Sequence, residues 1–290
     1  MSDSKHSSVH VGPADLHLHS SASDGRFTPE QVVRRAAQAG LKYIALTDHD
    51  TLAGLRQASE AASAAGIQLI PGIELSLEGS KHVHLLVYGV SDEMLPLVQL
   101  IQDARLDRES RMPRMLEKLR KLGMPLDAED IQLHPGVAFS RPLLARAMVS
   151  KGYVSSVQEA FDRFIGHGKP AYAPRRIIHS SDAIAMVRSL GCVPVLAHPA
   201  LMKYEAVERE KVVDSWIDAG LMGIEAHHPS MDTAQQQNWK RFAEDRGLIV
   251  TAGSDYHGTV DAMHGEIGSQ YVNWTDPHKN MEMLTAALSR

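Results

Sequence analysis

The sequence predicts an α/β protein with a mainly parallel sheet, either open or closed into a barrel. Short apolar runs alternate with segments that carry helical signals over both ends of the chain. Apolar residues make up 43% and charged residues 22% of the 290 residues, which is the balance of an ordinary globular protein. Histidines and carboxylates follow the apolar runs, where functional residues gather in α/β folds. The composition excludes a disordered chain, a coiled coil and a collagen-like fibre.

Seven apolar runs predict the strands: Ala14–His19, Tyr43–Thr47, Ile67–Leu77, Val83–Tyr88, Val193–Ala197, Gly223–Ala226 and Leu248–Ala252. Helical signals separate most of them. Thr28, Pro29 and Gln31 predict an N-cap, a first-turn proline and a capping box for a helix that Gly40 ends. Further helices, each followed by a glycine, are predicted over Thr51–Ala65, Ser181–Leu190 and Glu205–Ala219.

The alternation stops between about Ser91 and Lys169, where only helical patterns occur. Apolar residues repeat there at helical spacing and are expected in a core: Met112, Met115, Leu116, Leu119 and Leu122. We therefore predict a helical insertion over residues 99–169 within an α/β body of residues 1–98 and 170–290. Residues 101–176 carry 14 Lys and Arg against 9 Asp and Glu, whereas the rest carries 16 against 26. This basic insertion is either a substrate cap or a solvated helical surface.

Several classes of protein are excluded or disfavoured. A single cysteine, Cys192, forbids an intrachain disulfide and a cysteine-rich zinc site. The N-terminus lacks the apolar stretch of a secretory signal, and no run approaches the roughly 18 apolar residues of a membrane span. The net charge of −5 gives no general attraction to nucleic acid or to anionic membranes. We expect a cytoplasmic protein with no obligate protein partner.

The positions of the histidines indicate metal binding. Asp15, His17 and His19 alternate with leucines, so the three polar side chains share one face of the first strand. The ends of the later strands carry further imidazoles and carboxylates. Nine residues are candidate ligands: His17, His19, Asp24, His49, Glu74, His84, His198, Asp255 and His257. Imidazole with carboxylate suits Mn²⁺, Fe²⁺, Zn²⁺ or Mg²⁺. Nine ligands are enough for a cluster of two or three ions. Such a cluster can generate hydroxide at neutral pH and bind the attacking and leaving oxygens of phosphoryl transfer.

Six motifs resemble those of the PHP (polymerase and histidinol phosphatase) family in order and spacing. They are Asp15–Ser20, Ser23–Gly25, Thr47–Asp50, Pro71–Glu74, Ala197–Pro199 and Gly253–His257. The resemblance implies a distorted (β/α)7 barrel, similar to a TIM barrel, with a trinuclear metal centre and phosphoesterase activity. It places His17, His19 and Asp255 on one ion, with Glu74 bridging to a second.

The resemblance also implies that His84 and His198 complete the second ion, with His82 as the alternative to His84. Asp24, His49 and His257 would hold a third ion. Three divalent ions, with Mn²⁺ expected first and Zn²⁺, Fe²⁺ or Mg²⁺ as alternatives, are therefore implied. Asp24 stands where some relatives have histidine, which favours harder metals.

The chain is most similar to the TrpH/YciV-like branch of the family, through its length, its Ser23-Asp24-Gly25 motif and its insertion. Members of that branch are implied to remove the 3'-phosphate of nucleoside 3',5'-bisphosphates such as adenosine 3',5'-bisphosphate, leaving a nucleoside 5'-monophosphate. Related members trim short RNA from the 5' end. The expected enzyme is therefore a phosphoric monoester hydrolase whose partner is a nucleotide, and the alternative partner is a short RNA end.

Five further residues are candidate substrate contacts: Ser76, His134, Arg141, Lys169 and His228. Arg141 and Lys169 would supply the cationic donors that a phosphate needs, although either can equally be an ordinary surface residue. His228 would contact substrate or transfer a proton. Asp15, Asp48 and Asp50 can orient imidazoles, or Asp50 can cap a helix. No functional role is expected for His6, His10, His167, His179, His264 and His278.

Two other classes of function stay open at this stage. An amidohydrolase acting on a C–N bond also begins with His-x-His on its first strand, but no bridging lysine is evident and a third metal site is present. A non-catalytic metal-binding module is the other alternative, although the ligand set is complete and a polymerase region is lacking.

Overall fold

The computed structural model describes residues 13–77, 82–127, 129–131, 141–174, 178–271, 274 and 276–289. The chain divides into two compact units. Residues 1–98 with 177–290 form the first, called the barrel unit, and residues 99–176 form the second, called the helical unit. Each unit is described by itself.

Seven strands form one sheet in the barrel unit, in the order in which they follow along the chain. They are β1 (Ala14–Leu18), β2 (Tyr43–Leu46), β3 (Gln68–Leu77), β4 (Val83–Tyr88), β5 (Val193–Leu196), β6 (Gly223–His227) and β7 (Ile249–Ala252). A parallel bridge between Leu18 and Tyr256 joins β1 to the chain that follows β7. The sheet is therefore a nearly closed barrel, and the predicted α/β barrel class is confirmed.

One strand departs from the parallel arrangement. β4 is antiparallel to both β3 and β5, whereas the other neighbouring pairs are parallel. Only residues 78–82 separate β3 from β4, and a parallel crossover needs about a dozen residues or more. The reversal places His84 opposite Ser76, two residues from Glu74 on the adjacent strand.

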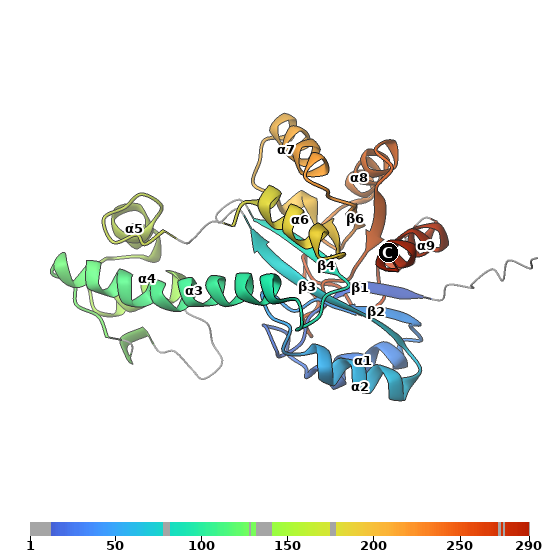
Figure 1. Cartoon of the computed structure of the whole chain (residues 1–290). Helices are drawn as coiled ribbons and strands as arrows, with labels where there is room; N and C mark the ends of the chain where they lie inside the picture. The colour runs from blue at the N-terminus through green and yellow to red at the C-terminus, as the bar shows by residue number, and fades with distance from the viewer. Residues whose placement is uncertain are drawn as a thin grey trace, which may run out of the picture. The chain divides into compact units, whose positions relative to one another are not determined.

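Helices surround the strands of the barrel unit (Figure 1). They are α1 (Pro29–Gln38), α2 (Leu55–Ala65), α6 (Ser180–Ser189), α7 (Ala206–Asp218), α8 (Thr233–Asp245) and α9 (Pro277–Leu288), with a short 3₁₀ turn η3 (Pro199–Leu201) after β5. The predicted capping box of α1 is confirmed: the Gln31 backbone N–H donates to Thr28 Oγ1 at 3.3 Å, and the Thr28 N–H donates to Gln31 Oε1 at 3.0 Å. The seven strands and the helices α1, α6 and α7 agree with the predicted segments to within a few residues, whereas α8 and α9 occupy segments for which no helix was predicted.

The predicted start of the second helix at Thr51 is wrong, because α2 begins at Leu55. The Thr51 hydroxyl accepts a hydrogen bond from the Ala53 N–H at 3.2 Å. A threonine that bonds nearby backbone in this way favours a turn over a helix.

Apolar side chains fill the space between the first two strands and the first two helices. Val32, Val33 and Ala36 of α1 pack in one cluster with Ala58 of α2 and Ile44 of β2. In the barrel, the buried Tyr88 hydroxyl donates to the backbone oxygen of Leu16 at 2.9 Å and thereby ties β4 to β1.

The helical unit contains most of α3 (Leu95–Lys121), with α4 (Arg141–Ser150), α5 (Val157–Ala160), a 3₁₀ turn η1 (Glu129–Ile131) and a π-turn η2 (Phe161–Ile165). Met115 and Leu119 are buried in its core, as predicted. The prediction for Leu122 is wrong, because its side chain is 44% exposed. α3 ends one residue earlier, so Leu122 no longer follows the helical repeat. None of the helices in the described part of the chain has the length and apolar character that a membrane span requires.

Candidate metal centre

Glu74 lies at the middle of the predicted ligands, and its side chain is fully buried. Its Oε2 atom lies 3.1 Å from His17 Nε2, 3.2 Å from His19 Nε2 and 3.1 Å from His49 Nδ1. Its Oε1 atom lies 2.9 Å from both His84 Nδ1 and His198 Nε2. The two carboxylate oxygens therefore face two different sets of imidazoles, which is the arrangement that a bridging carboxylate requires.

Asp255 lies beside Glu74, after the end of β7. Its Oδ1 atom is 3.3 Å from His17 Nε2 and 3.1 Å from His19 Nε2. The ligand atoms of His17, His19, Glu74 and Asp255 all lie within 4.8 Å of one another, and the four residues are buried. These four side chains are close enough together to hold a single ion.

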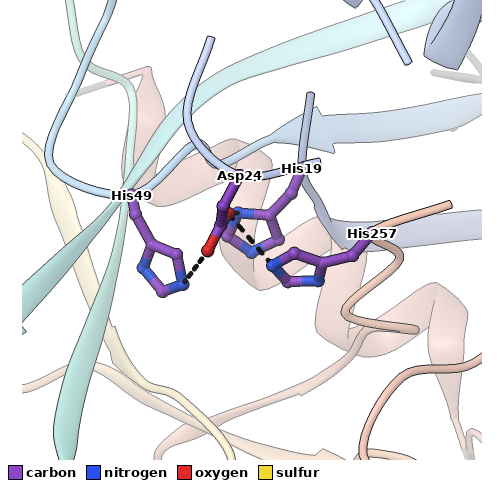
Figure 2. A group of neighbouring side chains, drawn as sticks. All are labelled: His19, Asp24, His49 and His257. Carbon is purple, nitrogen blue, oxygen red and sulfur yellow. Dashed lines mark ion pairs between the residues drawn. The ribbon is translucent and has the colours of Figure 1, made fainter. Parts of the chain in front are cut away.

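A second group surrounds Asp24, whose carboxylate points between three imidazoles (Figure 2). Asp24 Oδ1 lies 3.2 Å from His257 Nε2, and Asp24 Oδ2 lies 3.9 Å from His49 Nε2. With His19, these residues have ligand atoms within 4.8 Å of one another. The nine predicted ligands thus form one connected cluster.

Two buried carboxylates, Glu225 and Asp48, form hydrogen bonds with the candidate ligands or with the segment that carries one of them. Glu225 Oε1 lies 2.9 Å from His17 Nδ1, and its Oε2 accepts the backbone N–H of His198 at 2.8 Å. Glu225 therefore presents the Nε2 atom of His17 to Glu74, as carboxylates behind metal-binding histidines commonly do. Asp48 accepts from the backbone N–H and the hydroxyl of Ser20, both at 2.7 Å, and from the Ser23 hydroxyl at 2.6 Å. These bonds hold the turn that carries Asp24.

Two of the strand-end residues have strained backbones. The φ angles of His198 and Asp255 are 25° and 51°, a region that non-glycine residues rarely adopt. Such strain persists where the surroundings over-determine the conformation, which is common at functional sites.

Several buried polar atoms of the cluster form no hydrogen bond. Among the described residues, they include both ring nitrogens of His19, Nδ1 of His49 and of His198, and Asp255 Oδ1. His49 Nδ1 is nevertheless only 3.1 Å from Glu74 Oε2. Buried polar atoms are almost always satisfied, and nitrogen and oxygen atoms spaced in this way suit two ligands of one cation. The donor set therefore fits divalent metal ions.

The pKa values of the cluster are set by burial and by the charges that face one another. Burial alone would lower the pKa of His19, but the carboxylates of Asp255 and Glu74 outweigh it and raise the pKa to about 10. Burial would raise the pKa of Glu74, but His49, His17 and His84 hold it well below its usual range. Burial lowers the pKa of His49 to about 4 despite the charge of Glu74.

His84, and not His82, lies against Glu74. The side chain of His82 is exposed, and its ring centroid is 6.3 Å from that of His84. Partial burial, Lys203 and His84 lower the pKa of His82.

The predicted substrate contacts differ in whether they lie close to the candidate ligands. His228 joins the cluster, with its Nε2 atom 3.3 Å from Asp255 Oδ2 and its Nδ1 atom 2.8 Å from the Ser230 hydroxyl. Ser76 lies on β3, where its backbone N–H donates to Asp50 Oδ1 at 2.9 Å. His134 lies outside the described residues.

Arg141 and Lys169 belong to the helical unit. The Arg141 guanidinium carbon lies 5.5 Å from the ring centroid of Phe161 and 5.6 Å from that of Tyr172. Lys169 is exposed and follows a turn in which its N–H donates to the Gly166 oxygen at 3.0 Å.

Sequence reasoning missed two residues of this region. Glu225 is not among the predicted site residues, although a carboxylate inside an apolar strand is itself a signal of a buried partner. His264 was expected to have no function, yet its ring centroid lies 4.4 Å from that of His257. Its position depends on a loop, so no periodic pattern could have revealed it.

Comparison with known proteins agrees with this geometry. The PHP domain family model matches residues 15–123. A 5'-3' exoribonuclease of Haemophilus influenzae is 32% identical over 94% of this chain and 96% of its own length. A 3',5'-nucleoside bisphosphate phosphatase of Chromobacterium violaceum is 32% identical over 87% of this chain and 91% of its own length.

Two solved structures are similar over nearly the whole chain. One, described as an amidohydrolase from Chromobacterium violaceum with bound sulfate, has a TM-score of 0.72 and 28% identity over 95% of this chain and 96% of its own. Another, from Bifidobacterium adolescentis and assigned as a metal-dependent phosphoesterase, has a TM-score of 0.68 and 27% identity over 94% of this chain and 96% of its own.

Proposed function

The chain belongs to the PHP domain family, and we propose that it is a metal-dependent phosphatase that removes the 3'-phosphate of nucleoside 3',5'-bisphosphates. The observation that supports the proposal most is that the two carboxylate oxygens of Glu74 face two different sets of imidazoles. The substrate class follows the relative named as a 3',5'-nucleoside bisphosphate phosphatase.

Three divalent ions, with Mn²⁺ as the expected metal, would occupy the cluster. His17, His19 and Asp255 would hold the first ion, and Glu74 would bridge it to a second ion held by His84 and His198. Asp24, His49 and His257 would hold the third. When bound, divalent ions neutralise phosphoryl oxygens and lower the pKa of water.

The residues around the ligands prepare the site for substrate. Glu225 keeps a proton on His17 Nδ1 and so leaves Nε2 free to bind metal. The His257 Nδ1 atom lies 2.8 Å from the backbone oxygen of Asp255 and can donate to it, which leaves its Nε2 atom facing Asp24. Rings oriented in this way need no reorganisation when the anionic substrate binds.

Phosphate recognition would use residues beyond the metal ligands. His228 lies next to Asp255 and can contact a phosphoryl oxygen or donate a proton to the leaving oxygen. We further propose that residues 99–169 act as a substrate cap and that Arg141 and Lys169 bind a phosphate group. Ser76, on the strand that carries Glu74, would contact the substrate beside the ions.

The proposal is tested by supplying the metal-stripped full-length chain with Mn²⁺ and assaying three substrates in parallel. We expect fast release of phosphate from adenosine 3',5'-bisphosphate, with adenosine 5'-monophosphate as the product, and little release from histidinol phosphate. Preference for histidinol phosphate, or equal rates with and without a chelator, would contradict the proposal.

A 5'-3' exoribonuclease activity on short RNA is the second candidate, because a relative with that name is 32% identical over 94% of this chain. A 5'-phosphorylated RNA trimer is therefore the third substrate in the assay. Release of 5'-mononucleotides from the trimer at a higher kcat/KM than hydrolysis of the bisphosphate would favour this candidate.

A further inference from the structure

The loop from Gly258 to Gly268, which follows β7, is tied to the barrel at two points. The Gly265 N–H donates to the Ser254 oxygen and the Gly268 N–H donates to Asp15 Oδ2, both at 2.8 Å. A Cβ on Gly265 would lie 2.6 Å from Ser269 Oγ and 3.0 Å from Pro229 Cγ, so glycine permits this close approach. Because Gly265 bonds the residue before Asp255, the loop places His264 next to the metal cluster.

His264 lies among residues already placed in that cluster. The ligand atoms of Asp255, His257 and His264 lie within 4.8 Å of one another. The ring centroids of His257 and His264 are 4.4 Å apart, and the side chain of His264 is 22% exposed. These distances suit two imidazoles that share a cation.

Asp261 orients the ring of His264. Asp261 Oδ2 lies 2.9 Å from His264 Nδ1, while Oδ1 accepts the backbone N–H groups of Met263 at 2.7 Å and of His264 at 3.0 Å. An ionised carboxylate can only accept, so it keeps the proton on Nδ1 and leaves the lone pair of the neutral ring on Nε2. A carboxylate behind a histidine is the usual support of a metal ligand.

We propose that His264, oriented by Asp261, is an additional ligand for a divalent ion bound beside His257 and Asp255. This inference rests on the metal centre in the proposed function and adds a tenth ligand to it. Another imidazole makes the site richer in nitrogen and so favours Mn²⁺, Fe²⁺ or Zn²⁺ over Mg²⁺, which prefers oxygen ligands.

The test is a titration of the metal-stripped full-length chain with Mn²⁺, in which electron paramagnetic resonance counts the free ion. His264→Ala should weaken the binding of one class of Mn²⁺ by roughly 10-fold or more. Asp261→Asn should weaken the same class by a smaller factor. His278→Ala, which removes an exposed histidine of α9, is the matched control and should leave the titration unchanged.

Competition with Mg²⁺ supplies a second readout: His264→Ala should lose part of the preference of that class for Mn²⁺ over Mg²⁺. A His264→Ala titration that superimposes on the wild type overturns the inference, even if KM rises, because His264 would then contact only the substrate. A wild-type chain that binds no Mn²⁺ overturns both this inference and the metal assignment. Failure to release phosphate from the bisphosphate, with Mn²⁺ binding as expected, overturns the proposed substrate alone.

Discussion

The barrel unit buries polar and charged side chains, whereas the described part of the helical unit buries only apolar ones. In the barrel unit, the buried side chains include His17, His19, Glu74, Glu225 and Asp255. Burying charged groups costs free energy unless they are paired or bind metals. The charged groups buried in the barrel unit therefore lower its stability unless they are paired or bind metal, whereas the helical unit is stabilised by an ordinary apolar core.

The largest effect is expected where the barrel would lose its bridging carboxylate. Glu74→Gln keeps the size of the side chain but removes the negative charge between the two sets of imidazoles. The transition state should lose several kcal/mol of metal-dependent stabilisation, which would lower kcat/KM by roughly 10³-fold or more. The measurement is phosphate release in the presence of Mn²⁺. Glu60→Gln on the exposed face of α2 is the control, and similar rates for both variants would contradict the role of Glu74.

A substitution in the apolar core of the helical unit should instead change stability alone. Leu119 is fully buried there, so Leu119→Ala should destabilise that unit by about 2–5 kcal/mol in thermal or denaturant unfolding. Mn²⁺ binding should stay as in the wild type. Leu122→Ala, at a 44% exposed leucine close by, should have little effect on either measurement. Loss of Mn²⁺ binding in Leu119→Ala would show that the two units do not separate these tasks.

Substrate binding is where the helical unit would contribute to catalysis. Arg141→Ala should raise KM by roughly 10-fold or more, because a hydrogen bond to a charged group contributes about 1.5–3 kcal/mol. Mn²⁺ affinity should not change. Arg105→Ala removes an exposed arginine of α3 that pairs with Glu109 and tests for a general charge effect. Equal increases of KM in both variants would argue against a phosphate contact by Arg141.

A smaller effect is expected on the pH dependence of stability, which should differ between the metal-stripped and the metal-loaded protein. Despite burial, Asp255 and Glu74 raise the pKa of His19 from 6.5 to about 10. Protonated His19 therefore stabilises the metal-stripped fold fully below pH 6.5, and this contribution is lost as the pH rises through about 10. Metal ions bind the deprotonated imidazole, so the metal-loaded protein should gain stability with rising pH. Thermal unfolding between pH 6.5 and 8.5 should show opposite trends of a few degrees, and parallel trends would contradict the assignment.

Most of the secondary structure of the barrel could be predicted, because each strand is a short apolar run bounded by clear signals. The prediction failed where a local side chain competed with the helix, as at Thr51, and where a helix ended before its apolar repeat, as at Leu122. The antiparallel direction of β4 follows from the short link after β3, since five residues cannot form a parallel crossover.

The sequence by itself determined the class of fold and the chemical nature of the site. Imidazoles and carboxylates at the carboxyl ends of parallel strands meet at one end of the barrel, because the sheet brings those ends together. His84 joins them from the start of β4 because that strand is antiparallel. Which atoms meet was decided only by the tertiary structure. His17 and Glu225 are 208 residues apart in the chain but bond at 2.9 Å, and His264 reaches the cluster through a loop held by Ser254 and Asp15. Periodicity determines which face a side chain occupies, whereas ring orientation depends on contacts between distant segments.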